Sequence, residues 1–310
     1  MDKSNELVSV IIVASGISRY LFDCLVSVHA QSHSHLQVIV IDNSLNSFLS
    51  GKIKRAAPSA HLHICQVSTS YCDSLNIGIE KSSAEYILCL NDDVILENNF
   101  LEEALKGFLS GVGMVSGKIL RMDKKTIDTT GLFLSCFRTP RERGYSQKDR
   151  RKFQDPGFCF GVNGAVALYK KEMLDKIKEE NYFDSSFGFF YEDLDIAWRA
   201  QRKGWKGFYA PLAVAYHARG ATLRKEAVSG KIFARASISD SLLADLIKNR
   251  YLAIIKNESL LGFLWHLPEI LIYDCAAWSY CLLFRPGAAV IFLSRLKIIQ
   301  YALKKRLAKK

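Results

Sequence analysis

The chain has 310 residues, of which 49% are hydrophobic and 24% are charged, and it carries a formal net charge of +11. This length is sufficient for a full α/β core and a modest second region. The eight cysteines lack zinc or C-x-x-C spacing and no signal peptide precedes Val8, so we expect a reduced, cytosolic protein rather than a disulfide scaffold. No nucleic-acid recognition motif or stacking array accompanies the positive charge, which excludes nucleic acid as an expected partner.

Short apolar runs alternate with helix-compatible segments in the first third of the chain. The strand-like runs are residues 8–13, 37–41, 61–66 and 85–90, and the helix-compatible segments are residues 18–30, 72–81 and 99–109. This alternation predicts right-handed βαβ units and a largely parallel sheet. Neither a glycine-rich phosphate loop nor a G-x-G-x-x-G turn is present, so nucleotide hydrolysis and dinucleotide redox chemistry are not expected.

The fourth apolar run ends abruptly in Asn91, Asp92 and Asp93. Ligands of open α/β sheets bind at the carboxyl ends of the strands, which is where these oxygen ligands fall. Along an extended chain Asn91 and Asp93 point to one side and Asp92 to the other. This arrangement suits Mg²⁺ or Mn²⁺ that takes most of its remaining ligands from a diphosphate. An ordinary strand-ending turn without metal is the alternative, and both readings stay open here.

Basic residues dominate residues 138–152. We expect this stretch to form a mobile loop. Such a loop near a catalytic face gates substrates or attracts a diphosphate-linked lipid acceptor. A solvated loop without a role is the alternative.

Acidic residues gather where a helix is predicted to begin, near Tyr191. Asp195 and Arg199 are spaced to form an ion pair on that helix. Asp193 lies about 200° around the axis from Asp195 and cannot share the pair. It is therefore a candidate general base, whose pKa is raised by burial and like charges and lowered by the helix N-terminus. The alternative is that the acids, with Glu192, only cap the helix.

After about residue 220 the strand pattern stops and helices are expected. Residues 285–310 contain eight Lys or Arg and no Asp or Glu. An apolar stripe runs beside them, formed by Phe292, Leu296, Ile299, Leu303 and Leu307. Upstream, residues 260–265 and 275–284 are apolar, but charges and Pro268 are expected to keep them too short to span a bilayer. We expect helices in the interface of an anionic membrane; packing on the catalytic core or in a homo-oligomer is the alternative.

Together these motifs resemble the family-2 glycosyltransferases of the GT-A fold, most closely the branch of rhamnosyltransferases and galactofuranosyltransferases. The resemblance rests on residues 8–13, 38–44, 76–78, 90–93, 164–171, 183–184, 191–199, 216–217 and 248–250. It implies a Rossmann-like, mostly parallel sheet flanked by helices in a catalytic domain of residues 1–222. A helical, membrane-associated region of residues 223–310 would follow.

The resemblance also implies residue roles. Asp193 corresponds to the catalytic base, and Asp93 and His217 correspond to metal ligands. The implied donor-binding residues are Asp42, Asn43, Asn76, Asn91 and Asp92. The implied acceptor-binding or supporting residues are Glu192, Asp195, Arg199 and Arg250. The other histidines, including His29, His33 and His35, are expected to be structural or solvated.

The implied function is inverting, metal-dependent transfer of a sugar from a nucleotide-diphospho-sugar to a glycan or lipid-linked acceptor. The cofactor would be Mg²⁺ or Mn²⁺, and the protein would lie at the cytoplasmic face of the membrane during cell-envelope polysaccharide synthesis. Ala14-Ser15-Gly16 and residues 68–74 depart from the family pattern, so the nucleotide and the donor sugar stay open. A non-catalytic nucleotide- or glycan-binding relative and a nucleotidyltransferase are the alternatives, although the latter would need a phosphate loop that the N-terminus lacks.

Overall fold

A computed structural model describes residues 5–16, 19–219 and 238–308. These residues divide into two compact units. The first unit holds most of the chain up to residue 219. The second unit holds the described chain from residue 238 together with two short segments, residues 134–141 and 189–191. The boundary expected between residues 222 and 223 lies outside the described residues.

The first unit is built on a mixed sheet whose strand order is β10-β12-β6-β11-β4-β1-β2-β3, with β5 paired to β12 and β7 to β6. The strands β3-β2-β1-β4 are all parallel, as the sequence predicts for this half of the sheet. Their bounds are β1 Val8–Ala14, β2 Leu36–Asp42, β3 His61–Ile64 and β4 Tyr86–Asn91. The carboxyl ends of these strands therefore lie along one edge of the sheet.

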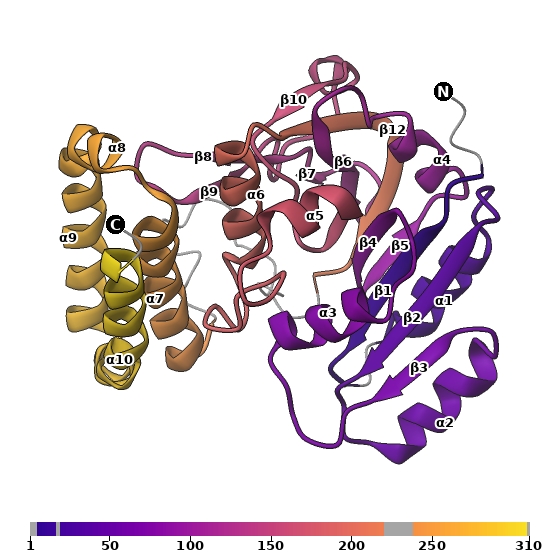
Figure 1. The fold of residues 1–310 in the computed structure, drawn as a ribbon, viewed down its shortest axis with the longest axis horizontal. Coiled ribbons are helices and arrows are strands. Elements are labelled where there is room, and N and C mark those ends of the chain that lie inside the picture. The colour runs from indigo at the N-terminus through magenta and orange to yellow at the C-terminus, as the bar shows by residue number, and fades with distance from the viewer. Residues whose placement is uncertain (1–4, 17–18, 220–237, 309–310) are drawn as a thin grey trace. The chain divides into compact units, whose positions relative to one another are not determined.

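The helices α1, α2 and α3 connect these strands, and α4 follows β5 (Figure 1). Their bounds are α1 Leu21–His29, α2 Ser47–Ala56, α3 Tyr71–Glu80 and α4 Phe100–Leu105. The sequence predicts α1, α3 and α4 but not α2. Few apolar residues define a period in α2, whose start is instead fixed by the Asn46 side chain accepting from the N–H of Phe48.

The other half of the sheet is mixed. The strand β11 is antiparallel to both β4 and β6, whereas β12 is parallel to β6, so the expected parallel sheet is confined to the first half. The strands here are β5 Val94–Leu96, β6 Val112–Arg121, β7 Ile127–Thr129, β10 Gly157–Cys159, β11 Val166–Lys170 and β12 Lys206–His217. A separate pair is formed by β8 Leu132–Leu134 and β9 Pro140–Glu142. The helices are α5 Lys171–Ile177 and α6 Glu192–Arg202.

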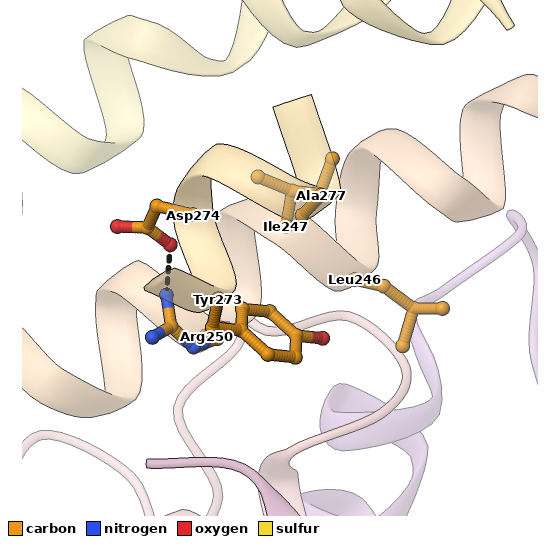
Figure 2. Close-up of a pocket in the computed structure, with 6 residues that line it drawn as sticks. All are labelled: Leu246, Ile247, Arg250, Tyr273, Asp274 and Ala277. Carbon is orange, nitrogen blue, oxygen red and sulfur yellow. Dashed lines mark hydrogen bonds and ion pairs between the residues drawn. The ribbon is translucent and has the colours of Figure 1, made fainter. Parts of the chain in front are cut away.

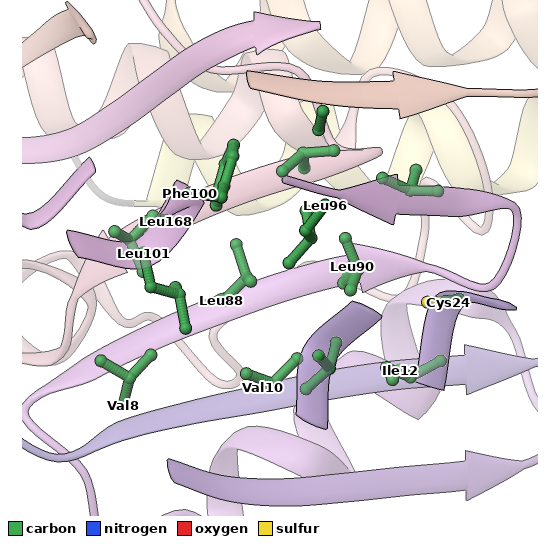
Figure 3. Close-up of a cluster of buried hydrophobic side chains, with 14 of the residues drawn as sticks. Val8, Val10, Ile12, Cys24, Leu88, Leu90, Leu96, Phe100, Leu101 and Leu168 are labelled. Atoms are coloured by element: carbon green, nitrogen blue, oxygen red, sulfur yellow. The ribbon is translucent and has the colours of Figure 1, made fainter. Parts of the chain in front are cut away.

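The main core follows from alternation along the strands. Val8, Val10 and Ile12 on β1 are all 0% exposed and point to the same face as Leu88 and Leu90 on β4 (Figure 3). Burying each such aliphatic side chain contributes about 1.5–3 kcal/mol. This rigid core fixes the strand ends that carry the polar residues of the site.

The basic stretch expected to be a mobile loop is largely structured. Glu142 belongs to β9, and a 3-10 turn spans Arg151–Phe153. Phe153 is buried and its carbonyl accepts a hydrogen bond from the Tyr209 hydroxyl, while Asp149 pairs with the buried Lys118 amine at 3.0 Å. The basic composition suggested solvent exposure, but the buried ring of Phe153 directly after the stretch and the ion pair of Asp149 with Lys118 anchor it.

The second unit is helical, as expected for the end of the chain. Its helices are α7 Asp240–Asn257, α8 Leu260–Trp265, α9 Leu267–Phe284 and α10 Pro286–Ala308. Its core is formed by Leu243, Ala244, Ile247, Cys281, Ala288 and Phe292. The Asn249 amide donates to the carbonyls of Phe189 and Phe190, which ties one of the two short segments to α7.

The expectation that Pro268 interrupts the apolar region is wrong. Pro268 stands at the start of α9, where a proline removes no helical hydrogen bond, so the helix continues unbroken for 18 residues. By length and composition alone, α9 reaches the threshold for crossing a membrane, a threshold that core helices of soluble proteins also reach. On α8, Leu261 and Trp265 are each 81% exposed.

The apolar stripe expected on the last helix is divided between two environments. Phe292 is buried in the helical core and Ile299 packs against it, whereas Leu303 and Leu307 are exposed. The Arg306 guanidinium donates to carbonyls at the end of α7, including that of Glu258 at 2.5 Å. This contact satisfies helix-terminal carbonyls, so α10 is an integral part of the helical unit rather than a free basic tail.

Candidate active site

Asp42 lies at the end of β2, where a donor-binding role is expected. It is 0% exposed, and both of its carboxylate oxygens accept hydrogen bonds. Oδ1 accepts from the N–H and hydroxyl of Ser44 at 3.0 and 2.5 Å, and Oδ2 accepts from the Ser50 hydroxyl at 2.5 Å. The structure thus gives Asp42 a role in shaping the β2–α2 turn, and its contact with a nucleotide stays a prediction.

Asn43 and Asn76 hold loops in place. The Asn43 side chain makes two hydrogen bonds with the backbone of Thr69, at 2.7 and 3.0 Å. The Asn76 side chain makes two with the backbone of Phe183, each 2.8 Å, across 107 residues of sequence. Asn43 thus joins the end of β2 to the residues before α3, and Asn76 joins α3 to the segment that precedes α6. Their direct contact with a donor stays a prediction.

Asn91 and Asp92 follow each other at the end of β4. The Asn91 Oδ1 accepts from the Tyr71 hydroxyl at 2.8 Å, and the same hydroxyl lies 3.4 Å from the Gly164 carbonyl oxygen. Burial and the charge of Asp93 raise the pKa of Asp92 to about 7. The strand end therefore carries an amide that is already oriented and a carboxyl that titrates near neutral pH.

Asp93 and His217 meet although they are far apart in the sequence. The His217 Nε2 lies 3.3 Å from the Asp93 Oδ1, and the two residues are 8% and 7% exposed. The pairing of β5 with the end of β12 brings them together. The predicted metal ligands are thus side by side.

A second carboxylate, not identified from the sequence, holds the other side of the His217 ring. The Asp128 Oδ2 lies 2.8 Å from the His217 Nδ1, and the Arg219 Nε donates to the Asp128 Oδ1. Burial raises the pKa of Asp128, but the bond from His217 and the charge of Arg219 outweigh it and lower the pKa overall. Despite the cost of its own burial, the imidazole has its pKa raised to about 9 by hydrogen bonds to Asp128 and Asp93.

The donor set suits a divalent cation that shares its ligands with a substrate. Among the described residues, no group of three or more His, Cys, Asp or Glu side chains forms a metal cluster. Asp93 and His217 supply one oxygen and one nitrogen 3.3 Å apart. Adjacent ligands of an octahedral ion with bonds of about 2.1 Å are roughly 3 Å apart, so the pair fits two neighbouring positions of Mn²⁺ or Mg²⁺. The remaining positions would be filled by diphosphate oxygens and water.

Asp193 lies in the first turn of α6, as predicted. Its Oδ2 accepts from the N–H of Gly164 at 3.1 Å and its Oδ1 from the N–H of Leu194 at 2.7 Å. Burial raises the pKa of Asp193, and these backbone donors oppose the rise. A Cβ on Gly164 would lie 3.1 Å from the Glu192 Oε1 and 3.7 Å from the Asp193 Oδ2, so glycine allows the close approach.

The other acids of α6 differ from Asp193. Asp195 forms the expected pair with Arg199 at 2.9 Å, and the Arg199 guanidinium also donates to the carbonyls of Ile177 and Tyr182. Both side chains are buried, so this pair supports the helix. Glu192 is buried beside Gly164. Its contact with an acceptor stays a prediction.

Glu142 is a site residue that the sequence did not reveal, because it belongs to the stretch expected to be a loop. Its Oε1 accepts from the Asn163 amide at 2.5 Å. Within the described part of the chain, its buried Oε2 has no hydrogen-bond partner. Burial and the charges of Asp193 and Asp128 raise the pKa of Glu142 to about 8. Burial and neighbouring negative charge therefore favour the protonated form of this carboxyl group.

Arg250 lies in the helical unit, where it lines a small pocket with Tyr273 and Asp274 (Figure 2). Its guanidinium pairs with Asp274, donates to the carbonyl of Phe137 and lies 4.4 Å from the centre of the Tyr273 ring. Arg250 is 2% exposed, so the structure gives it a supporting role. Its contact with an acceptor stays a prediction.

The turn at Gly164 joins the parts of the site. Its carbonyl lies near the Tyr71 hydroxyl that holds Asn91, its N–H binds Asp193, and the preceding Asn163 holds Glu142. The strand end of β4 and the start of α6 thus converge on one turn. An anionic leaving group could bind beside Asn91 and Asp93 only with a cation held by Asp93 and His217, and Asp193 stands as a candidate proton acceptor.

Comparisons with known proteins agree with this geometry. A sequence profile described as "Glycosyltransferase like family 2" matches residues 5–230. The poly-β-1,6-N-acetyl-D-glucosamine synthase of Staphylococcus aureus strain COL is 23% identical over 211 residues, which cover 64% of this chain and 47% of the synthase. The chain thus spans about half the length of the curated relatives it matches.

Two solved structures share the fold. GalNAc-T7 with UDP, GalNAc and Mn²⁺ has a TM-score of 0.59 at 12% identity, covering 81% of this chain and 48% of GalNAc-T7. The mannosyltransferase PcManGT from Pyrobaculum calidifontis, in complex with GDP-Man and Mn²⁺, has a TM-score of 0.54 at 15% identity, covering 98% of this chain and 79% of the mannosyltransferase. The fold is the GT-A fold expected from the sequence.

Proposed function

This chain belongs to glycosyltransferase family 2, and on that premise we propose that it transfers a sugar from a nucleotide-diphospho-sugar to a hydroxyl group of a glycan or lipid-linked acceptor, with inversion at the anomeric carbon. The observation that carries the proposal is the carboxylate of Asp193. It accepts hydrogen bonds from the N–H of Leu194 on α6 and from the N–H of Gly164, on the turn that also meets the end of β4.

Asp193 acts as the general base. Burial raises its pKa, which strengthens it as a proton acceptor, while the two backbone donors stabilise the ionised form that the reaction needs. Asp193 takes the proton from the acceptor hydroxyl as its oxygen attacks the anomeric carbon. The proposal requires the base and the leaving diphosphate to lie on opposite sides of that carbon, and a single displacement with that arrangement inverts the configuration.

Asp93 and His217 would hold a divalent cation. When bound, such a cation supplies positive charge that stabilises the departing diphosphate. Asn91, oriented by the Tyr71 hydroxyl, is proposed to contact the donor beside this pair. Both solved structures described above contain Mn²⁺ with a nucleotide or nucleotide-sugar, which supports the use of a divalent cation here.

For the substrates, the relative that is named as a synthase of an N-acetylglucosamine polymer supports a role in cell-envelope polysaccharide synthesis. The name of this relative makes a nucleotide-activated N-acetylglucosamine the first donor to test. The residue pattern that resembles rhamnosyl- and galactofuranosyltransferases makes their donors the alternatives. The exposed Leu261 and Trp265 of α8 support contact with a membrane surface, from which we propose that the acceptor is drawn. The cytoplasmic face and the anionic character of that membrane stay predictions.

The test is a donor screen. UDP-, dTDP- and GDP-sugars are added to the protein with Mn²⁺ or with chelator, and the unfolding temperature and the release of nucleoside diphosphate are measured. We expect sugars of one nucleotide class to raise the unfolding temperature only when the metal is present. In Asp193→Asn the release of nucleoside diphosphate should be lost, while the rise in unfolding temperature should remain. Asp123→Asn, at an exposed turn residue bonded to Thr126, is the matched control. Failure of every donor to stabilise or react contradicts the proposal.

A further inference from the structure

His217 is held between two carboxylates that come from different strands. Its Nδ1 lies 2.8 Å from the Asp128 Oδ2, and its Nε2 lies 3.3 Å from the Asp93 Oδ1. Asp128 is the central residue of β7, and His217 is the last residue of β12. The two partners therefore use the two ring nitrogens separately, one on each side.

Asp128 cannot turn away from the ring, because its other oxygen is also bound. The Arg219 Nε donates to the Asp128 Oδ1, and the guanidinium lies 4.7 Å from the centre of the Tyr145 ring, whose hydroxyl is 3.4 Å from the Arg219 Nη1. Asp128 is 0% exposed. Bonded at both oxygens and enclosed on all sides, this carboxylate is a fixed element of the site.

A fixed carboxylate opposite Nδ1 decides what the other ring nitrogen can do. The carboxylate accepts a hydrogen bond from Nδ1, so in the neutral ring the proton stays on Nδ1 and the lone pair lies on Nε2. That lone pair lies on the side of Asp93. Carboxylates that bind the far nitrogen of a metal-binding histidine commonly fix its tautomer and orientation in this way.

We propose that Asp128 is a positioning residue that, together with Arg219, sets His217 so that Nε2 and the Asp93 oxygen face a divalent cation and the diphosphate of the donor together. The inference rests on the proposed function, because it assigns the cation to the site of Asp93 and His217. It adds a residue that lies 89 positions from His217 and belongs to none of the motifs in the sequence.

A purely structural ion pair makes a different prediction. If Asp128 only joins β7 to β12, its loss lowers the unfolding temperature and leaves the metal affinity of the folded protein unchanged. If it positions His217, Asp128→Asn lowers the affinity for the metal even when the protein is fully folded. The amide has the same shape but no charge, and it leaves the tautomer of the ring unspecified.

The experiment measures Mn²⁺ binding, alone and with UDP or GDP, from the electron paramagnetic resonance signal of the free ion. The variants are Asp128→Asn, Asp128→Ala and, as a conservative replacement, Asp128→Glu. Asp149→Asn is the matched control, because Asp149 forms an ion pair with Lys118 outside the site. We expect 10- to 100-fold weaker Mn²⁺ binding for Asn and Ala, partial recovery for Glu, and no change for the control.

A second readout is the nitrogen NMR signature of the His217 ring, identified by its loss in His217→Gln. The spectra are recorded well above pH 9, where the ring is neutral because the pKa of His217 is raised to about 9. There we expect the Nδ1-protonated tautomer in the wild type and a mixture of tautomers in Asp128→Asn. Wild-type affinity and an unchanged tautomer in a folded Asp128→Asn protein overturn the positioning role and leave the proposed function intact. If the wild type itself binds no Mn²⁺ with either nucleotide, the metal site of the proposed function fails, and this inference fails with it.

Discussion

Replacing Asp193 by Asn separates chemistry from binding. The amide keeps the shape of the side chain but cannot accept a proton. A missing general base lowers turnover by about 10²–10⁴, which corresponds to about 2.7–5.5 kcal/mol in the activation free energy. Donor affinity should change little, because the proposed donor contacts lie on other residues, including Asn91 and Asp93.

The structure also limits the cost of this change to folding. Asp193 accepts two backbone hydrogen bonds, from Gly164 and Leu194. An asparagine has one side-chain oxygen, so one of the two N–H groups loses its acceptor, at a cost of about 1–3 kcal/mol. For a chain of this size that lowers the unfolding temperature by roughly 2–12 °C. The protein should stay folded at the assay temperature.

The assay compares initial rates of sugar transfer with donor affinity from calorimetry, for the wild type, Asp193→Asn and the control Asp123→Asn. We expect the rate of Asp193→Asn to fall by at least a factor of about 100 while its donor affinity stays within about threefold. A rate close to that of the wild type would refute the base and leave Asp193 as a helix cap. A rate loss matched by an equal loss of donor affinity would mean that Asp193 binds the donor instead.

Four further predictions follow from the site and the helices. Asp93→Ala should abolish metal-dependent donor binding in calorimetry without unfolding the protein. If the wild type binds the donor with full affinity in excess chelator, donor binding needs no metal and the prediction is contradicted. Asp195→Asn should cost about 3–5 kcal/mol in urea unfolding, because it leaves the buried Arg199 without its carboxylate; a loss below about 1 kcal/mol refutes it. The folded-state pKa of His217 is raised to about 9, so the stability that its charged ring gives the folded protein is present in full below its usual pKa and is lost as pH rises through 9. In chelator, the excess unfolding free energy of the wild type over His217→Gln should therefore shrink between pH 6.5 and 9. A difference that stays constant over this range contradicts the ion pairs. Leu261→Ser with Trp265→Ser should weaken sedimentation with anionic vesicles by about tenfold for each residue and spare donor hydrolysis, and the wild-type binding should fall as salt rises; a wild type that ignores such vesicles refutes the membrane surface.

The first half of the fold follows closely from the sequence because β1 and β4 are buried along nearly their whole length and helices separate the strands. The runs at residues 8–13 and 85–90 became β1 and β4 with nearly the expected bounds. The later strands are short, as in β7 and β10, or interrupted by register shifts, as in β12. Such strands have too few alternating positions to be recognised locally.

The site was predictable where chemistry is concentrated in neighbouring residues. Asp193, Asp195 and Arg199 have the helix positions and the pairing that their spacing indicates. Asp128 and Glu142 were not predictable, because Asp128 is isolated in the sequence and Glu142 lies in a basic stretch expected to be a loop. Both become part of the site only through sheet pairing or burial. His29, His33 and His35 bind backbone carbonyls, which confirms their structural role.

The composition of the helical unit has a consequence for protein engineering. Residues 134–141 and 189–191 belong to it, and the carbonyls of Phe137, Phe189 and Phe190 accept hydrogen bonds from Arg250 and Asn249 on α7. Phe190 and Tyr191 also have positive φ angles of 69° and 70°, a conformation that needs such external support. A chimera that exchanges the C-terminal helices with those of a relative must therefore exchange these two inserted segments as well, or the grafted helices lose the carbonyls that their Asn and Arg side chains bind.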